Sequence, residues 1–327
     1  MELRKDPITR SWVAIRNGEP QEPPAEPCPF CSGAQQPAPP LLTLPENSAP
    51  AQVRVFPQTD PLFRIEGETA RAAEGIYDKM RAVGAHEVIV ELAEHGRRLS
   101  QASDEEIARV LEAYARRLAD LKKDDRFKYI SVFKNVGAAA GQEIPHPHSE
   151  LVATPFVPRR VLHELRSARD YWELKERCLF CDMLRQELDQ KTRLVEATEN
   201  YAAFCPFATR SPYEIWLLPR RHHHSFETDT RRAATAAALA RLLRHTLERV
   251  EQLAEGYHLV LHTNPNTSGT LQRVGFWKSL PEDFHWHLEL MPLVAHKPRP
   301  YIAKEVYFTT VAPETAAARL RALSVTD

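Results

Sequence analysis

Cysteine and histidine residues recur in the same order in the two halves of the chain. Each half contains a Cys-x-x-Cys pair, then a histidine that follows a strand-like segment, and finally a His-x-His-x-Glu run. The residues are Cys28, Cys31, His95, His146, His148 and Glu150 in the first half, and Cys178, Cys181, His222, His285, His287 and Glu289 in the second. This parallel spacing indicates an internal repeat of one structural unit.

Thiol and imidazole groups in this combination are typical ligands of a structural zinc ion, which binds four of them. The two predicted sets are Cys28, Cys31, His95 and His146, and Cys178, Cys181, His222 and His285. Four protein ligands leave no open position for a substrate, so both zinc ions are predicted to be structural. Buried free cysteines and core histidines would explain any single residue, but not two parallel sets. A redox role for the pairs is the alternative, and it requires accessible thiols of low pKa.

The His-x-His spacing places two imidazoles on one face of a strand, because side chains i and i+2 point the same way. In the second half, His285, His287 and Glu289 alternate with apolar residues, as in a half-buried strand. In the first half, Pro147 requires an edge or irregular position. One imidazole of such a pair can bind the metal while the other stays free as a nucleophile or ligand contact.

The elements between these motifs follow a repeat as well. Strand-like segments precede the single histidines and the His-x-His runs, at 87–92, 129–135, 213–218 and 257–262. A helix is predicted after Ser103, which forms a capping box with Glu106. Its counterpart runs from about Thr228 to Ala254, and a third helical stretch, about Pro158 to Arg177, links the halves.

Composition narrows the class of protein. The 327 residues include 43 Lys and Arg against 44 Asp and Glu, so the charge gives no case for a nucleic-acid or anionic-membrane partner. No apolar run approaches the roughly 18–20 residues that cross a bilayer. The charged start, MELRKD, lacks a signal-peptide core. A cytoplasmic enzyme is therefore expected.

The segment 133–150, FKNVGAAAGQEIPHPHSE, resembles the active-site segment of galactose-1-phosphate uridylyltransferases. Residues 4–13, the Cys28–Cys31 pair and the segment 284–287 are similar to that family too, so the resemblance covers nearly the whole chain. It implies an α+β fold of tandem histidine-triad-like halves, with antiparallel sheets flanked by helices. The N-terminal half, 1–157, would carry the catalytic His-Pro-His, and the C-terminal half would be 158–327. ADP-glucose phosphorylase is a sibling family that has a second Cys-x-x-Cys much like Cys178/Cys181.

The resemblance also implies the chemistry. His148 would attack the α-phosphorus of UDP-glucose, and the resulting covalent nucleotidyl-histidine would pass UMP to galactose 1-phosphate. Catalytic roles fall on His148 and Glu150, and substrate contacts on Phe133, Asn135, Gly141, Gln142, Glu143 and His287. Neutral imidazole is a good nucleophile near pH 7, and covalent catalysis divides the reaction into two steps. The alternatives are an ADP-glucose phosphorylase-like adenylyltransferase and a zinc-stabilised nucleotide-binding protein without transfer activity. Family members are often dimers, but no interface can be identified in the sequence.

Three features of the sequence depart from the family pattern. Glu150 stands where the uridylyltransferases usually have Gln, and an ionised carboxylate cannot donate a hydrogen bond to a phosphoryl oxygen. Arg16 is the only arginine of an expected Arg-x-x-Arg pair, and Gln58 replaces an expected Asn. Some family members build the second metal site from a Glu and three His, which here would be Glu164, His262, His285 and His287. The Cys178/Cys181 set is favoured because thiolates suit zinc.

Overall fold

The computed structural model describes most of the chain. The described residues are 1–16, 28–31, 34, 38–46, 48, 51–142, 144–231, 233–268, 277–294 and 306–326.

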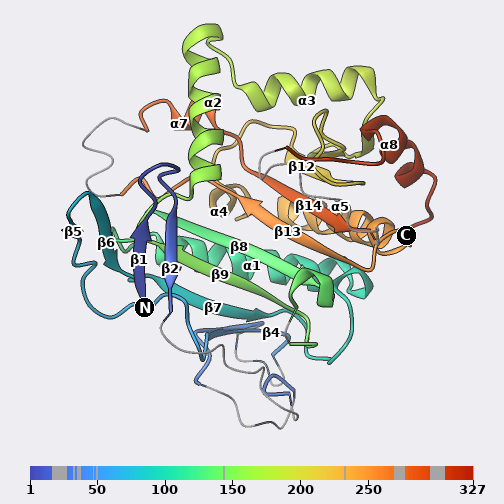
Figure 1. The fold of residues 1–327 in the computed structure, drawn as a ribbon. Coiled ribbons are helices and arrows are strands. Elements are labelled where there is room, and N and C mark those ends of the chain that lie inside the picture. Colours follow the sequence, from blue (N-terminus) through green and yellow to red (C-terminus); the bar gives the residue numbers. More distant parts are fainter. Residues whose placement is uncertain are drawn as a thin grey trace.

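One ten-stranded antiparallel sheet forms the centre of the molecule (Figure 1). Its order is β10-β11-β12-β14-β13-β8-β9-β7-β4-β3. The bounds are β3 (Leu42–Leu44), β4 (Val53–Pro57), β7 (Ala85–Val90), β8 (Tyr129–Val136), β9 (His148–Thr154), β10 (Leu194–Ala197), β11 (Tyr201–Phe204), β12 (Ile215–Pro219), β13 (Gly256–His262) and β14 (His287–Leu293). The strands of the first half fill one end of the sheet and those of the second half fill the other.

The two halves meet where β8 pairs with β13, in a register that runs from Tyr257–Val136 to Leu261–Val132. Backbones approach closely at this junction, since a Cβ on Gly256 would lie 2.2 Å from the carbonyl oxygen of Val136. Glycine is therefore required there. The expectation of antiparallel sheets flanked by helices is confirmed, but the halves share one continuous sheet.

Helices α1 (Asp104–Leu121) and α5 (Ala233–Glu251) cover one face of this sheet (Figure 1). The predicted capping box of α1 is present, with reciprocal bonds between Ser103 and Glu106. The helix buries an apolar stripe against the strands, made of Ile107, Val110, Leu111, Tyr114, Leu118 and Leu121. The predicted helix 228–254 is shorter than expected, because the short helix α4 (Phe226–Asp229) precedes α5 separately.

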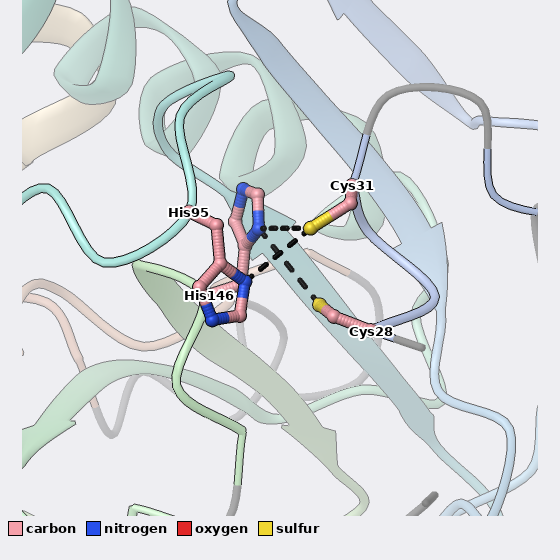
Figure 2. Close-up of side chains that lie close together, drawn as sticks. All are labelled: Cys28, Cys31, His95 and His146. Atoms are coloured by element: carbon pink, nitrogen blue, oxygen red, sulfur yellow. Dashed lines mark hydrogen bonds between the residues drawn. The ribbon is translucent and has the colours of Figure 1, made fainter. Parts of the chain in front are cut away.

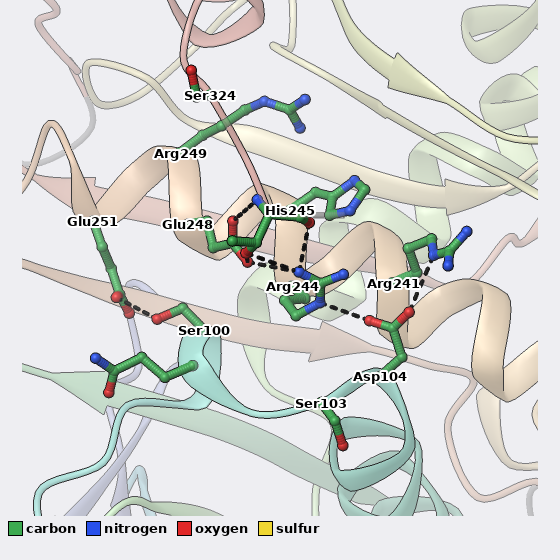
Figure 3. A network of polar contacts seen from close by, with 12 residues as sticks. Ser100, Ser103, Asp104, Arg241, Arg244, His245, Glu248, Arg249, Glu251 and Ser324 are labelled. Carbon is green, nitrogen blue, oxygen red and sulfur yellow. Dashed lines mark hydrogen bonds and ion pairs between the residues drawn. The ribbon is translucent and has the colours of Figure 1, made fainter.

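Polar contacts join these two helices across the halves (Figure 3). Asp104 at the start of α1 accepts from Arg244 Nε at 2.7 Å and from Arg241 Nε at 3.1 Å. Ser100, in the 3₁₀ turn η1 (Leu99–Gln101), donates to Glu251 at 2.5 Å. Because of these links and the shared sheet, the two helices form one layer that packs on the strands of both halves.

The opposite face of the sheet is covered unevenly. Over the second half lie α2 (Arg159–Lys175), α3 (Leu179–Gln190) and α7 (Leu280–Asp283). Over part of the first half lies a small sheet of order β2-β1-β6-β5, whose Leu3 and Met80 pack against Val152. Its strands are β1 (Glu2–Lys5), β2 (Trp12–Ile15), β5 (Ala72–Glu74) and β6 (Tyr77–Arg81), and α8 (Pro313–Arg321) packs near β10. Among the described helices, none is both long and apolar enough to span a bilayer.

Candidate functional site

The first predicted metal set comes together where β7 ends and β9 begins (Figure 2). The ligand atoms of Cys28, Cys31, His95 and His146 all lie within 4.8 Å of one another. His146 turns Nδ1 toward both thiols, each 3.9 Å away, and His95 Nδ1 lies 3.3 Å from the Cys31 sulfur. His146 Nε2 donates to the carbonyl of Leu92 at 2.8 Å. This bond fixes the tautomer that offers Nδ1 to a metal.

The second set repeats this arrangement. The ligand atoms of Cys178, Cys181, His222 and His285 also lie within 4.8 Å of one another. His222 Nδ1 and His285 Nδ1 face the Cys181 sulfur at 3.3 and 3.5 Å, and His222 Nε2 donates to the Pro281 carbonyl at 2.8 Å. The angle between the two imidazole planes is also similar, at 79° for His95 and His146 and 70° for His222 and His285.

Both sets fit zinc. Each offers two thiols and two imidazole nitrogens that converge on one point, as four-coordinate structural sites do. Burial, the largest influence, lowers the pKa of His146 and favours the neutral ring that a metal ligand must have. The chain therefore has two Cys2His2 clusters that could hold metal ions.

His148 begins β9, two residues after the metal-set His146. Its Nδ1 lies 2.7 Å from the carbonyl of His146. Because a carbonyl only accepts, Nδ1 carries the proton, and the lone pair of the neutral ring is on Nε2. The two histidines of the motif thus hold opposite tautomers, and the second presents a basic nitrogen.

The glycine-containing segment before this strand turns tightly. Gly137 and Gly141 have φ values of 89° and 79°, which favour glycine. Between them lies the 3₁₀ turn η2 (Ala138–Ala140). The Gln142 side chain accepts from the Gly137 N–H at 2.8 Å and donates to the Ile144 carbonyl at 2.9 Å. Gln142 therefore shapes the loop, and Glu143 lies outside the described residues.

Two other predicted contacts lie on the same side of the sheet as His148. Asn135 accepts on its amide oxygen from Nδ1 of His258 at 2.8 Å, so its NH2 group is turned away from that ring. Phe133 is partly buried and packs against the small sheet. It pairs across the ladder with Glu150, two residues beyond His148.

Glu150 has a partner that the sequence did not reveal. Its Oε2 lies 2.7 Å from Nε2 of His86, whose Nδ1 accepts from the Leu62 N–H at 3.2 Å. The Leu62 bond places the ring proton on Nε2, so His86 donates to the carboxylate. This pairing directs Glu150 along the sheet toward His86.

A cleft of about 1670 Å³ adjoins this pair. His86 forms part of its wall, together with Gln58, Asp60 and Arg64. Arg16, the arginine kept from the expected pair, lines the same cleft and is paired with Asp60.

His287 lies in a third cluster with Glu164, His262 and Glu289. The alternative metal set, Glu164, His262, His285 and His287, is therefore not gathered as one group: His285 joins the thiols, and Glu289 takes its place. Strand and helix geometry explain the division, because His285 precedes β14 and faces the start of α3, where Cys178 and Cys181 lie.

The third cluster is already balanced in charge. Glu289 is paired with Arg160 at 2.9 Å and Arg210 at 2.6 Å. Although burial opposes it, the carboxylates of Glu164 and Glu289 raise the pKa of His262 to about 9. Burial and the neighbouring His262 lower the pKa of His287 to about 4. The His287 ring has no exposed surface.

Comparison with known proteins shows which family has this sequence and fold. The family model described as galactose-1-phosphate uridyl transferase, N-terminal domain, matches residues 45–158. ADP-glucose phosphorylase from Arabidopsis thaliana is 30% identical over 99% of this chain and 93% of its own length. The chain belongs to the galactose-1-phosphate uridylyltransferase family. Galactose-1-phosphate uridylyltransferase from Thermotoga maritima is 32% identical over 68% of this chain and 67% of its own. A solved uridylyltransferase structure superposes with a TM-score of 0.81, with 28% identity and 98% of each chain covered.

Two histidines of this site could not be identified from the sequence. His86 and His258 each hold a predicted residue, Glu150 and Asn135 respectively. The available signal was a polar residue within an otherwise apolar strand, which shows that a side chain has a partner but not which one.

Proposed function

We propose that this protein transfers a nucleotidyl group from a nucleoside-diphosphate sugar to a phosphate acceptor through a covalent intermediate on His148. The orientation of His148 supports the proposal most strongly. With the proton held on Nδ1 by the His146 carbonyl, Nε2 is the nitrogen available to attack phosphorus.

The first step forms a bond between Nε2 and the α-phosphorus and breaks the bond from that phosphorus to the bridging oxygen. The sugar 1-phosphate leaves with the electron pair. The positive charge that develops on the ring is stabilised by the His146 carbonyl oxygen, which accepts the hydrogen bond from Nδ1. In the second step, an acceptor phosphate oxygen attacks the phosphorus, and the electron pair returns to Nε2 as neutral His148 is restored.

Other residues would position the substrate. The NH2 group of Asn135, oriented by His258, could donate to a phosphoryl oxygen near His148. Glu150 is held by His86, which agrees with a carboxylate that lies beside the phosphate rather than against it. The cleft beyond His86 has room for the nucleoside or the hexose. The zinc ions, bound by the two Cys2His2 sets, would supply rigidity to the strands that carry these residues.

Two donors are candidates. Several relatives, including the Thermotoga maritima protein, are named galactose-1-phosphate uridylyltransferase, which favours transfer of UMP from UDP-glucose to galactose 1-phosphate. Release of ADP-glucose's sugar phosphate with inorganic phosphate as acceptor is favoured by a different observation. The similarity to ADP-glucose phosphorylase extends over 99% of the chain, through both Cys2His2 sets.

The test is intact mass spectrometry after brief incubation with UDP-glucose, UDP-galactose or ADP-glucose. We expect one nucleotidyl adduct, with its mass naming the base. It should vanish in His148→Ala and persist in His163→Ala, a change to an exposed histidine on α2. A folded, metal-loaded protein that binds the donors without forming an adduct would support the non-catalytic alternative instead.

A further inference from the structure

A buried polar network lies behind His148, on the side of the sheet that faces α1. Lys134 Nζ donates to Glu91 Oε2 at 2.7 Å, and Ser149 Oγ donates to Glu91 Oε1 at 2.5 Å. The Tyr114 hydroxyl contacts Ser149 Oγ at 2.5 Å and Glu91 Oε1 at 3.2 Å. These residues are at most 3% exposed, and they lie among the apolar side chains that are buried between the sheet and α1.

This network holds the main chain that carries the imidazole. Lys134 Nζ also donates to the carbonyl of His148 at 3.0 Å, and the Glu91 N–H donates to the carbonyl of Pro147 at 3.0 Å. The next carbonyl back, that of His146, is bonded to the His148 ring itself. Three successive carbonyls, 146 to 148, therefore have a fixed donor: the His148 ring, the Glu91 main-chain N–H and the Lys134 ammonium. The Glu91 carboxylate holds that ammonium in place.

The sheet opens at this point, which explains why a side chain supplies the bond. The ladder between β8 and β9 runs from Tyr129–Thr154 to Phe133–Glu150 and ends there. Beyond it, Lys134 and Asn135 pair only with β13, at Leu259 and His258. The strand edge beside His148 is thus free of β8, and the Lys134 ammonium takes the place of a ladder bond.

The second half shows that the fold does not need this network. There the ladder continues to His262–His287, the pair that contains the counterpart of His148. Registers give the equivalent positions: Val260 pairs with Glu289 as Phe133 pairs with Glu150, so Leu261 corresponds to Lys134. By the same alignment, Leu288 corresponds to Ser149. Apolar side chains therefore occupy the positions where the first half buries the lysine of the ion pair and the serine hydroxyl.

Burying a lysine and a glutamate in such a layer brings a desolvation penalty that a hydrophobic pair avoids. We propose that Lys134 and Glu91 are positioning residues, which keep the His146–His148 main chain in the place where Nε2 meets the α-phosphorus. This inference rests on the proposed function. It predicts that the pair affects the rate of phosphorus transfer rather than the stability of the fold or the affinity for the donor.

The experiment uses the full chain with Lys134→Met and Glu91→Gln combined, which keeps side-chain shape and leaves no unpaired charge. Formation of the nucleotidyl enzyme is followed by rapid quench and mass spectrometry under single-turnover conditions. We expect the limiting rate to fall by about 10- to 100-fold, as small misplacements of reacting groups do. The donor concentration at half-maximal rate and the Tm should stay near those of the unaltered protein.

The matched control is Lys122→Met with Glu227→Gln. This buried Lys–Glu pair, 2.6 Å apart, joins α1 to α4 without touching the His146–His148 main chain. We expect its limiting rate to match that of the unaltered protein. Ser149→Ala is a second variant, which removes one anchor of Glu91 and should slow the transfer by a smaller factor.

The outcomes separate the two proposals. If the unaltered protein forms an adduct and both the double variant and Ser149→Ala form it at the same rate, the positioning role is wrong and the proposed function stands. The positioning role is also wrong if the double variant and its control lose rate and Tm together. If the unaltered protein forms no adduct with any donor, the proposed function fails and the positioning role falls with it.

Discussion

The second histidines of the two His-x-His-x-Glu runs share one ring orientation but differ in what surrounds them. In both, the second histidine directs Nδ1 at the carbonyl two residues earlier, at 2.7 Å for His148 and 3.1 Å for His287. His287, however, is stacked between Trp216 and His262, at centroid distances of 5.0 and 4.7 Å. Helix α2 covers that cluster with Glu164 and Arg160. The comparison teaches that the repeat sets ring orientation, whereas the covering elements determine whether the ring can meet a ligand.

Exchanging one histidine in each run should give the largest contrast. His148→Gln should abolish the nucleotidyl adduct, with a loss of about a thousandfold or more in turnover, while the Tm changes little. His287→Gln should lower the stability by roughly 1–3 kcal/mol, because it removes a fully buried ring that stacks on Trp216 and His262. The measurements are the mass of the adduct and the thermal unfolding of both variants. A stable His287→Gln protein would show that the two runs are less different than their surroundings indicate.

Loss of one metal ion should affect the two halves differently, although by less than the histidine substitutions do. We expect about two zinc ions per chain by elemental analysis, as closed four-ligand sites imply. Cys31→Ser and Cys181→Ser should each lose one ion and several kcal/mol of stability. Activity should suffer more in Cys31→Ser, since His146 shares a strand segment with His148. Equal loss of activity in both variants would argue that the sites act only through global stability.

The pH dependence of stability should reveal the covered cluster. The folded-state pKa of His262, about 9, lies above its ordinary value of 6.5. Its charge therefore contributes stability fully below pH 6.5, and this contribution disappears as the pH rises through 9. The shift corresponds to about 3 kcal/mol. The Tm advantage of the unaltered protein over His262→Gln should shrink between pH 6.5 and 9.5, and an advantage that is constant across this range would contradict the assignment.

Glu150→Gln should have the smallest effect. The substitution keeps an oxygen that can accept from His86, and it adds N–H donors that could reach a phosphoryl oxygen. We expect a change of a few-fold in the rate of adduct formation, and no change in Tm beyond the range of ordinary surface substitutions, ~0.5 kcal/mol. His86→Asn is the companion variant, because it removes the partner and leaves the carboxylate. A large rate loss in Glu150→Gln would show that the carboxylate itself is required.

Spacing and residue type were sufficient to identify the two Cys2His2 groups, because zinc ligand sets have a restricted chemistry. The same was true of the α1 capping box and the main strands, whose periodicity is local. The sequence favoured His285 as the partner of the two thiols, and the grouping of the second site agrees with that choice. What it could not show is that His262 and His287 lie with Glu164 and Glu289 in a separate cluster. That grouping depends on how α2 packs on the sheet. The partners of Glu150 and Lys134 were also hidden, because His86 and Glu91 are separated from them by 64 and 43 residues.

The contact between Gly256 and the Val136 carbonyl has a consequence for the pieces of this molecule. The bonds between β8 and β13 lie at the middle of the sheet, so cutting the chain between the halves would turn two central strands into open edges. An open edge of this kind is a template for pairing with another chain. A fragment that ends at residue 157 is therefore expected to self-associate through β8. Mixing it with the complementary fragment should restore the pairing of β8 with β13 in a one-to-one complex.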